Sequence, residues 1–178
     1  MKKFLVLLFI CQSLLFGYTY NDLLIKAQTA LFPKILLLDK NLSQKLVNEK
    51  IVYIVAYEEH DLLTAMQVVE YLHAQFSEQL DEHRLDVRLV PFHEIDEQTR
   101  ATAIYVLHSE SHIGRVADIA QSQGIMTFAY DIVHLREGLL FSLMVEKSTV
   151  LYLAKESLPA YRIEFIDVLY QIVRFMDE

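Results

Sequence analysis

Residues 51–57 read Ile-Val-Tyr-Ile-Val-Ala-Tyr, and the fold class follows from this stretch. It is a continuous run of β-branched, aromatic and small apolar residues, which is typical of a strand covered on both of its faces. Strands of that kind belong mostly to parallel sheets that carry helices on both sides. We therefore expect an α/β protein whose sheet is built outward from residues 51–57.

The segments that follow alternate between strand-like and helix-like patterns. Three shorter apolar runs resemble the first one, at residues 85–90, 102–107 and 125–130. An apolar stripe from Leu62 to Leu80 is spaced by three and four residues, which predicts a helix with Asp61 as its N-cap. A second stripe from Ile113 to Ala120 predicts a helix that Gly124 closes. Such alternation predicts βαβ units and a largely parallel sheet.

The two ends of this region differ from its middle. Residues 20–31 have helical spacing, and Pro33 should kink or end that helix. Residues 139–145 and 149–153 are strand-like and so close in sequence that they must form an antiparallel hairpin at an edge of the sheet. A last amphipathic helix is predicted from Ile166 to Met176. The expected fold is a single-domain α/β sandwich with a mixed, largely parallel sheet, an antiparallel edge hairpin and flanking helices.

The composition is that of one globular domain. The chain has 178 residues, of which 53% are hydrophobic, with only four Gly and three Pro. A chain of this size and composition can bury enough apolar surface to fold, which excludes a disordered segment. Its formal net charge is −8. We therefore expect no nucleic-acid partner, because nucleic-acid binding depends on Lys and Arg that neutralise phosphates.

The first residues have the layout of a secretory signal. Two lysines precede an apolar run at residues 4–16, which is shorter than the roughly 20 residues of a membrane-spanning helix. We expect residues 1–17 to be a signal peptide cut after Gly17, and residues 18–178 to be an exported periplasmic domain. A buried first helix or an uncleaved anchor is the alternative. Cys11 is the only cysteine, so the mature domain would have no thiol for catalysis or for zinc.

Candidate site residues gather where the parallel strands should end, since ligands of open α/β sheets bind beyond the carboxyl ends of the strands. They are Tyr57, Glu58, His60, His108, Ser109, Tyr130 and Asp131. Histidines and carboxylates could hold a transition metal. The simpler interpretation is that the serines cap the next helix and the acids are solvated. We therefore expect neither a metal nor another cofactor.

No catalytic motif accompanies these residues. A triad of Ser109, His108 and Asp131 is disfavoured, because no G-x-S-x-G surrounds the serine and adjacent strand residues point to opposite sides. The Gly-rich loops that cradle dinucleotides or triphosphates are also missing. We expect a protein that is not an enzyme.

Three parts of the chain carry a resemblance to a known family. They are Lys26-Ala27 with residues 31–34, residues 104–108 with the Ser-Glu that follows, and the closing order of residues 125–131, Gly138, 141–153 and 163–175. Together they resemble the YfiR-like family of periplasmic regulatory proteins. The resemblance implies a regulator that binds the periplasmic domain of an inner-membrane signalling protein, a diguanylate cyclase of cyclic-di-GMP signalling or a sensor kinase. The paired cysteines common in that family are missing here, which argues against redox control.

Two functions from different classes follow. The first is the non-enzymatic regulator just described. A helix that packs one stripe cannot bury all of Leu36, Leu37 and Leu38, so at least one should reach the surface and mark a partner contact. The alternative is that the whole run of leucines is deeply buried. A homodimer is a further possible partner arrangement. The second function is a small-ligand-binding module of a transport or sensing system that uses the residues at the strand ends. A metal-dependent hydrolase at the same residues is a third alternative.

Overall fold

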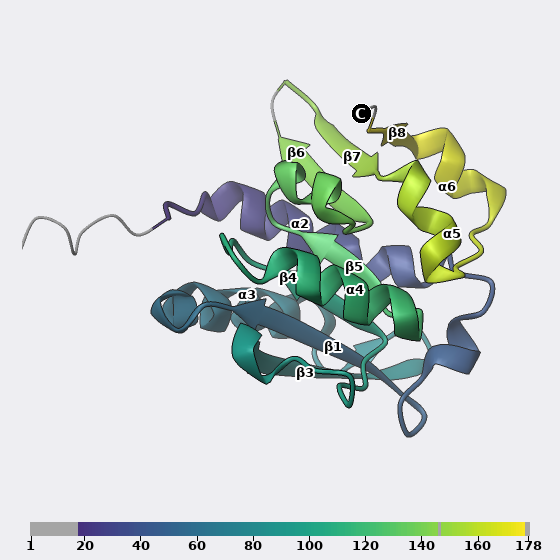
Figure 1. Ribbon diagram of the computed structural model, residues 1–178. Coiled ribbons are helices and arrows are strands. Elements are labelled where there is room, and N and C mark those ends of the chain that lie inside the picture. Colours follow the sequence, from purple (N-terminus) through teal and green to yellow (C-terminus); the bar gives the residue numbers. More distant parts are fainter. Residues whose placement is uncertain (1–17, 146, 177–178) are drawn as a thin grey trace, which may run out of the picture.

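The centre of the molecule is one mixed β-sheet (Figure 1). The computed structural model describes residues 18–145 and 147–176, and within these ranges eight strands follow the order β2-β3-β1-β4-β5-β6-β7-β8. The strands are β1 (Lys50–Tyr57), β2 (Gln79–Leu80), β3 (His83–Pro91), β4 (Ala103–Val106), β5 (Met126–Ala129), β6 (Phe141–Val145), β7 (Thr149–Leu153) and β8 (Val173–Phe175). The antiparallel pairs are β2 with β3 and β6 with β7, and the others are parallel.

Helices cover both faces of this sheet. They are α2 (Asp22–Leu36), α3 (Leu62–Phe76), α4 (Ile113–Gln123), α5 (Leu158–Tyr161) and α6 (Asp167–Ile172). Figure 1 shows α4 in front of the sheet and α3 behind it; α2 packs against α3, while α4 packs against α5. Within the described ranges, no helix is long and apolar enough to cross a membrane. The predicted fold class, an α/β sandwich with a mixed and largely parallel sheet, is confirmed.

The order of the strands reverses at β1. This strand pairs in parallel with β3 on one side and with β4 on the other. The chain leaves β1 through α3 to form β3, and then returns past β1 to form β4. In an open α/β sheet, such a reversal opens a crevice at the carboxyl ends of the two strands that flank it. The fold therefore prepares a ligand site at the ends of β1 and β4.

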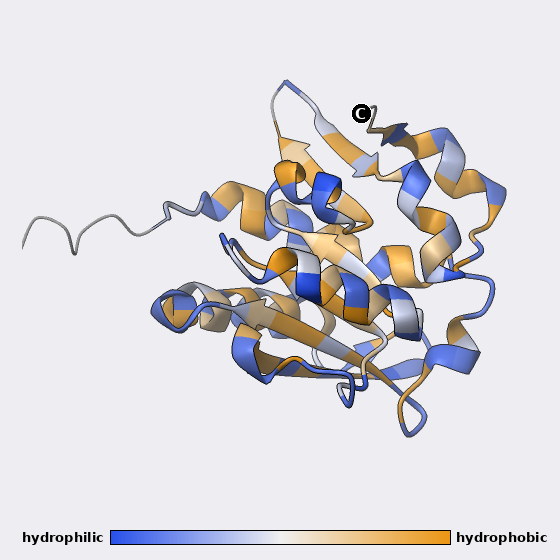
Figure 2. Cartoon of the chain, viewed as in Figure 1, coloured by the Kyte–Doolittle hydropathy of each residue, from blue (hydrophilic) through white to orange (hydrophobic). Residues whose placement is uncertain are grey.

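The core explains why β1 occupies the centre. Residues 51–56 are buried on both faces, as their apolar run predicts. Aromatic rings fill the space between α2 and the sheet, where Phe32 stacks on Phe128 with ring centroids 4.7 Å apart and Phe128 stacks on Phe141 at 5.6 Å. Figure 2 shows hydrophobic colouring along the central strands and hydrophilic colouring on many of the connecting loops.

The two terminal helices differ from the prediction. Of the two outcomes predicted at Pro33, a kink or an end, the end does not occur, because α2 continues through Pro33 to Leu36. A proline inside a helix costs about 3 kcal/mol, but Phe32 and Ile35 on either side of it are fully buried, and their burial offsets that cost. At the other end, α6 stops at Ile172 and residues 173–175 form β8, which pairs with β7. The Val-Arg-Phe alternation of these residues suits a strand better than a helix.

Candidate functional site

A cavity of about 490 Å³ opens at the carboxyl ends of β1 and β4. Its walls come from the residues after β1, from the loop between β4 and α4, and from the first described residue of the chain. The lining residues are Tyr18, Glu58, His60, His108, Ser109, Glu110 and Ser111. The cavity thus lies at the crevice that the strand order prepares, and its volume falls in the range of small-molecule sites.

One wall is a hydrogen-bonded group around Glu58. Ser109 Oγ donates to Glu58 Oε1 at 2.5 Å, and His112 Nδ1 lies 3.0 Å from the same oxygen. Ser109 Oγ also accepts the backbone N–H of His112 at 3.1 Å and so holds the turn before α4. The N-cap of α4 is His112, which makes no side-chain capping bond, so the expectation that the serines cap this helix is wrong. Partial burial acts to raise the pKa of Glu58, but the hydrogen bonds from Ser109 and His112 outweigh it and the pKa is lowered. Glu58 therefore stays ionised and holds the two loops together.

A second wall is formed by Tyr18, the first of residues 18–21, which we call the N-terminal strap. Tyr18 stacks on His108 with ring centroids 4.0 Å apart, and its hydroxyl donates to Asp131 Oδ2 at 2.8 Å. The hydroxyl of Tyr20 donates to Asp61 Oδ2 at 2.6 Å and accepts the backbone N–H of His108 at 3.1 Å. Burial, together with the hydrogen-bonded carboxylates, raises the pKa of both tyrosines, so both remain hydrogen-bond donors. The strap therefore ties the loops after β1, β4 and β5 together.

The strap leads directly into α2, which is anchored in the sheet by a buried glutamine. Gln28 Nε2 donates to the backbone oxygens of Tyr130 at 2.9 Å and of Leu143 at 3.2 Å. Gln28 Oε1 accepts the hydroxyl of Tyr105 at 2.5 Å. Because Gln28 and Tyr105 are both buried, these bonds are closed to water. They fix the height of α2 above the sheet, and with it the position of the strap.

Behind the strap lie two neighbouring histidines. The rings of His108 and His134 have centroids 5.3 Å apart and are tilted by 35°. His134 is buried, and its Nδ1 lies 2.8 Å from Glu137 Oε1. In the described part of the chain, His108 Nδ1 and His134 Nε2 are the two buried side-chain polar atoms without a hydrogen-bond partner. Burial and the nearby imidazole of His134 lower the pKa of His108, which keeps that ring neutral at neutral pH.

The structure brings five of the predicted residues to one place. Glu58, His60, His108 and Ser109 line the cavity, and Asp131 accepts the hydrogen bond of Tyr18 next to it.

Two of the predicted tyrosines have other roles. Tyr130 is buried, and its hydroxyl accepts the backbone N–H of Asn21 at 2.7 Å, so it supports the strap. Tyr57 is half-buried and packs against the core, outside the residues that line the cavity.

The three consecutive leucines 36–38 at the C-terminal end of α2 differ in how much of each side chain is exposed. Leu37 is 36% exposed, so one of the three does reach the surface. Leu36 is fully buried and cannot contact a partner, which corrects its assignment to a contact surface. Leu38 is half-buried and packs against the core. Leu36 is in the core because α2 continues past Pro33 and carries this side chain on its buried face.

Comparisons with known proteins bear on the fold of the chain. No protein-family model matches the sequence, and no curated protein matches it. A conserved domain protein from Vibrio cholerae O1 biovar eltor str. N16961 has a similar structure, with a TM-score of 0.58 and 13% identity over 86% of this chain and 60% of that one. An ABC domain in complex with L-Trp from Streptococcus pneumonia gives a TM-score of 0.52 and 14% identity over 79% of this chain and 60% of that one.

At these identities the likeness shows the fold alone. The chain spans 60% of the length of each of these two solved structures.

Sequence reasoning missed three residues that build the site. Tyr18 lies at the predicted cleavage point and His134 is far from His108 in sequence, yet both flank His108. Gln28 sits within an apolar helical stripe. The one local signal that could have found Gln28 is a polar residue among the apolar positions of a helical stripe, because a polar group that is buried must find hydrogen-bond partners.

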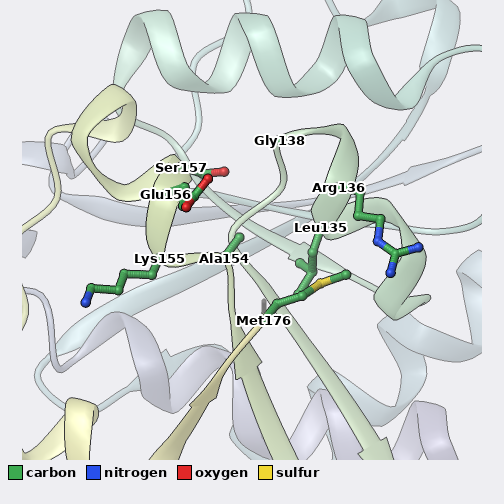
Figure 3. A pocket seen from close by; sticks show the side chains of 8 residues that line it. All are labelled: Leu135, Arg136, Gly138, Ala154, Lys155, Glu156, Ser157 and Met176. Atoms are coloured by element: carbon green, nitrogen blue, oxygen red, sulfur yellow. The ribbon is translucent and has the colours of Figure 1, made fainter. Parts of the chain in front are cut away.

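Two further features carry no site chemistry. Among the described residues, no three or more His, Cys, Asp or Glu side chains are grouped so that they could hold a metal ion. A second hollow of about 280 Å³ is shown in Figure 3, where Leu135 and Met176 point toward its middle while Lys155 and Arg136 point away on opposite sides. The two cationic side chains therefore do not converge in the middle of that hollow.

Proposed function

We propose that the protein is a small-molecule-binding module without catalytic turnover, and that its ligand occupies the cavity at the ends of β1 and β4. The observation that carries this proposal is the position of the cavity at the reversal of the strand order, with polar side chains from both flanking loops. Export to the periplasm through a cleaved signal peptide is part of the same proposal.

The chemistry of the lining favours binding over hydrolysis. Ser109 Oγ donates to Glu58 and accepts backbone amides at the start of α4, so the hydroxyl is fully engaged in holding the loops. A nucleophilic serine instead needs a base that takes its proton while the oxygen faces the substrate. The ABC domain with a similar fold was solved with an amino acid bound. That complex supports the proposal that this architecture can hold a ligand of comparable size.

The test is a binding measurement with a variant that fills the cavity. Wild-type protein is screened calorimetrically against the twenty common L-amino acids and their decarboxylated amines, and the purified protein is denatured to release any co-purified ligand for mass spectrometry. Ser111→Trp places an indole in the cavity and should abolish saturable binding, since Ser111 lines it. Ser148→Trp, at an exposed position in the turn between β6 and β7, is the matched control and should bind as the wild type does. Equal binding by both variants would place the ligand elsewhere and refute the proposal.

A second candidate function is the regulator of a membrane signalling protein, as the YfiR-like resemblance implies. The observation that favours it is a group of exposed apolar side chains near the N-terminal ends of α2 and α3. Leu63 is 81% exposed, and Leu23 and Met66 are also exposed. The two helices are close together there, because Gln67 Nε2 on α3 donates a hydrogen bond to Asp22 Oδ1 on α2. Leu23 is the neighbour of Asp22 in sequence, and Met66 is the neighbour of Gln67. Exposed apolar groups of this kind often mark protein contacts.

This second candidate predicts a specific loss of binding. Purified protein should capture an inner-membrane sensor protein from solubilised membranes, and Leu63→Asp should abolish the capture without lowering the melting temperature. Lys147→Asp, in the exposed turn between β6 and β7, is the control that should retain it. Retention of the partner by Leu63→Asp would exclude this surface.

A further inference from the structure

The two unpartnered histidine nitrogens behind the strap have a common explanation. His108 Nδ1 and His134 Nε2 are both buried, and their rings are neighbours with centroids 5.3 Å apart. A buried polar atom without a partner is costly, and two of them side by side are satisfied together if one carries the proton and the other accepts it. One hydrogen bond between these two nitrogens would satisfy both.

Glu137 determines which of the two histidines donates that hydrogen bond. Glu137 Oε1 lies 2.8 Å from His134 Nδ1, and a carboxylate accepts, so His134 carries its proton on Nδ1. A neutral imidazole has one donor and one acceptor nitrogen, which leaves His134 Nε2 as an acceptor. His108 must then donate from Nδ1. Its own acceptor is then Nε2, and His108 lines the cavity.

We propose that Glu137, His134 and His108 form a chain of hydrogen bonds that presents the lone pair of His108 Nε2 to the cavity, and that the site selects its ligand by an ammonium or other cationic hydrogen-bond donor. This inference rests on the proposed small-molecule function and names the class of ligand. Among the described residues that line the cavity none is Lys or Arg, whereas Glu58 and Glu110 are both present. A ligand recognised by an anionic group would find no cationic partner there, while an amine finds an acceptor nitrogen and a negative field.

The groups packed around His108 agree with a neutral ring. Tyr18 from the strap stacks on the ring, and His134 lies beside it, while the charges of the carboxylates of Asp131, Glu110 and Asp61 act on it in the opposite direction. Desolvation and the nearby His134 lower the pKa of His108, and they outweigh the three carboxylates. The lone pair on Nε2 is therefore free at neutral pH, and it is lost when the ring is protonated in acid.

The first part of the test needs no ligand. Heteronuclear NMR of the imidazole nitrogens distinguishes a protonated from a bare nitrogen in each ring. We expect His108 to carry its proton on Nδ1 in the full protein at neutral pH. His134→Phe should shift His108 toward the Nε2-protonated form, and Glu137→Leu, at a half-exposed position that tolerates substitution, should do the same if His134→Phe fails to fold. His83→Phe, at the start of β3, is the matched control and should leave His108 unchanged.

The second part uses three related probes. Tryptamine has the ammonium group alone, indole-3-propionate has the carboxylate alone, and L-tryptophan has both. We expect tryptamine to bind and indole-3-propionate not to bind. Loss of one hydrogen bond in His134→Phe or Glu137→Leu should weaken tryptamine binding about 5- to 10-fold, whereas His83→Phe should not change it.

The outcomes separate this inference from the function on which it rests. A wild-type His108 protonated on Nε2 overturns the chain of hydrogen bonds, whatever the probes do. Binding of indole-3-propionate at least as tight as that of tryptamine overturns the cationic class of ligand while the small-molecule function stands. If His108 has the expected tautomer and no probe binds, the chain is supported and the proposed function fails for these ligands.

Discussion

Replacement of Gln28 by leucine should destabilise the protein far more than a change of similar size elsewhere. The side chain is fully buried, and it makes hydrogen bonds with the backbone oxygens of Tyr130 and Leu143 and with the hydroxyl of Tyr105. Leucine occupies a similar volume but can neither donate nor accept. The substitution therefore removes one hydrogen bond from each of these three groups in a region that water does not reach.

The expected loss follows from the cost of stranded polar groups. Each buried donor or acceptor that loses its partner costs about 1–3 kcal/mol, and part of this is recovered where the backbone oxygens keep a second bond. For the three groups together we expect about 3–5 kcal/mol, a large share of the 5–15 kcal/mol that stabilises an ordinary domain. For a domain of this size, such a loss lowers the melting temperature by roughly 10 °C.

Gln121→Leu is the matched control for this experiment. Gln121 is half-buried and donates to the backbone oxygen of Gly138, which also accepts the hydroxyl of Tyr161, so little is stranded when it is replaced. Urea unfolding followed by circular dichroism gives the free energy of unfolding of each variant. Adding Tyr105→Phe to Gln28→Leu removes one stranded hydroxyl, so the double variant should lose less than the two single losses combined. A Gln28→Leu variant that loses no more stability than Gln121→Leu would refute the reasoning.

Three further outcomes are expected. Leu36→Asp should prevent folding, whereas Leu37→Asp should change the melting temperature by only a few degrees, because Leu36 is fully buried and Leu37 is 36% exposed; similar losses would contradict this assignment. Burial acts to raise the pKa of Glu58, but the bonds from Ser109 and His112 lower it overall, so its contribution to stability is complete above the ordinary pKa of 4.5 and is lost as the pH falls through the lower folded value. The difference in stability between the wild type and Glu58→Gln, measured by urea unfolding, should therefore shrink in acid, and a difference that grows would count against it. N-terminal sequencing of exported protein should begin near Tyr18, and an intact Met1 would exclude cleavage.

The parts of the fold that could be predicted are those decided by the residues of a single segment. Residues 51–57 form a buried strand because every side chain in the run is apolar, and Gly124 ends α4 because its φ of 70° suits glycine. Pro33 does not end α2 for a physical reason: the stop signal of a proline is local, and the burial of its neighbours overrides it. The strand at residues 173–175 depends on the free edge of β7, which the sequence of that segment alone does not reveal.

The candidate site was predictable where it depends on topology and not where it depends on distant contacts. Glu58 and Ser109 could be placed together, because the carboxyl ends of neighbouring parallel strands meet at one edge of a sheet. Tyr18 contacts Asp131 across 113 positions of sequence, and no pattern near either residue announces that contact. The pairing of His108 with His134 has the same origin, since it follows from how the loop after β5 returns beside the loop after β4.

The short strand β8 at one edge of the sheet limits how two copies of the molecule can join there. Among the described strands, β8 is the outermost at that edge and has three residues, whereas at the other edge β2 pairs with only His83 and Arg84 of the longer β3. An edge as short as β8 offers few free backbone groups, so two copies gain little by joining their sheets at that edge. Beneath β8 lies β7, which reads Thr-Val-Leu-Tyr-Leu without a charge or a proline and is therefore prone to self-association when uncovered. Because β8 pairs with β7, it covers this self-associating strand. A chain shortened to Ile172 would leave the outer edge of β7 uncovered, and other copies could then pair with it.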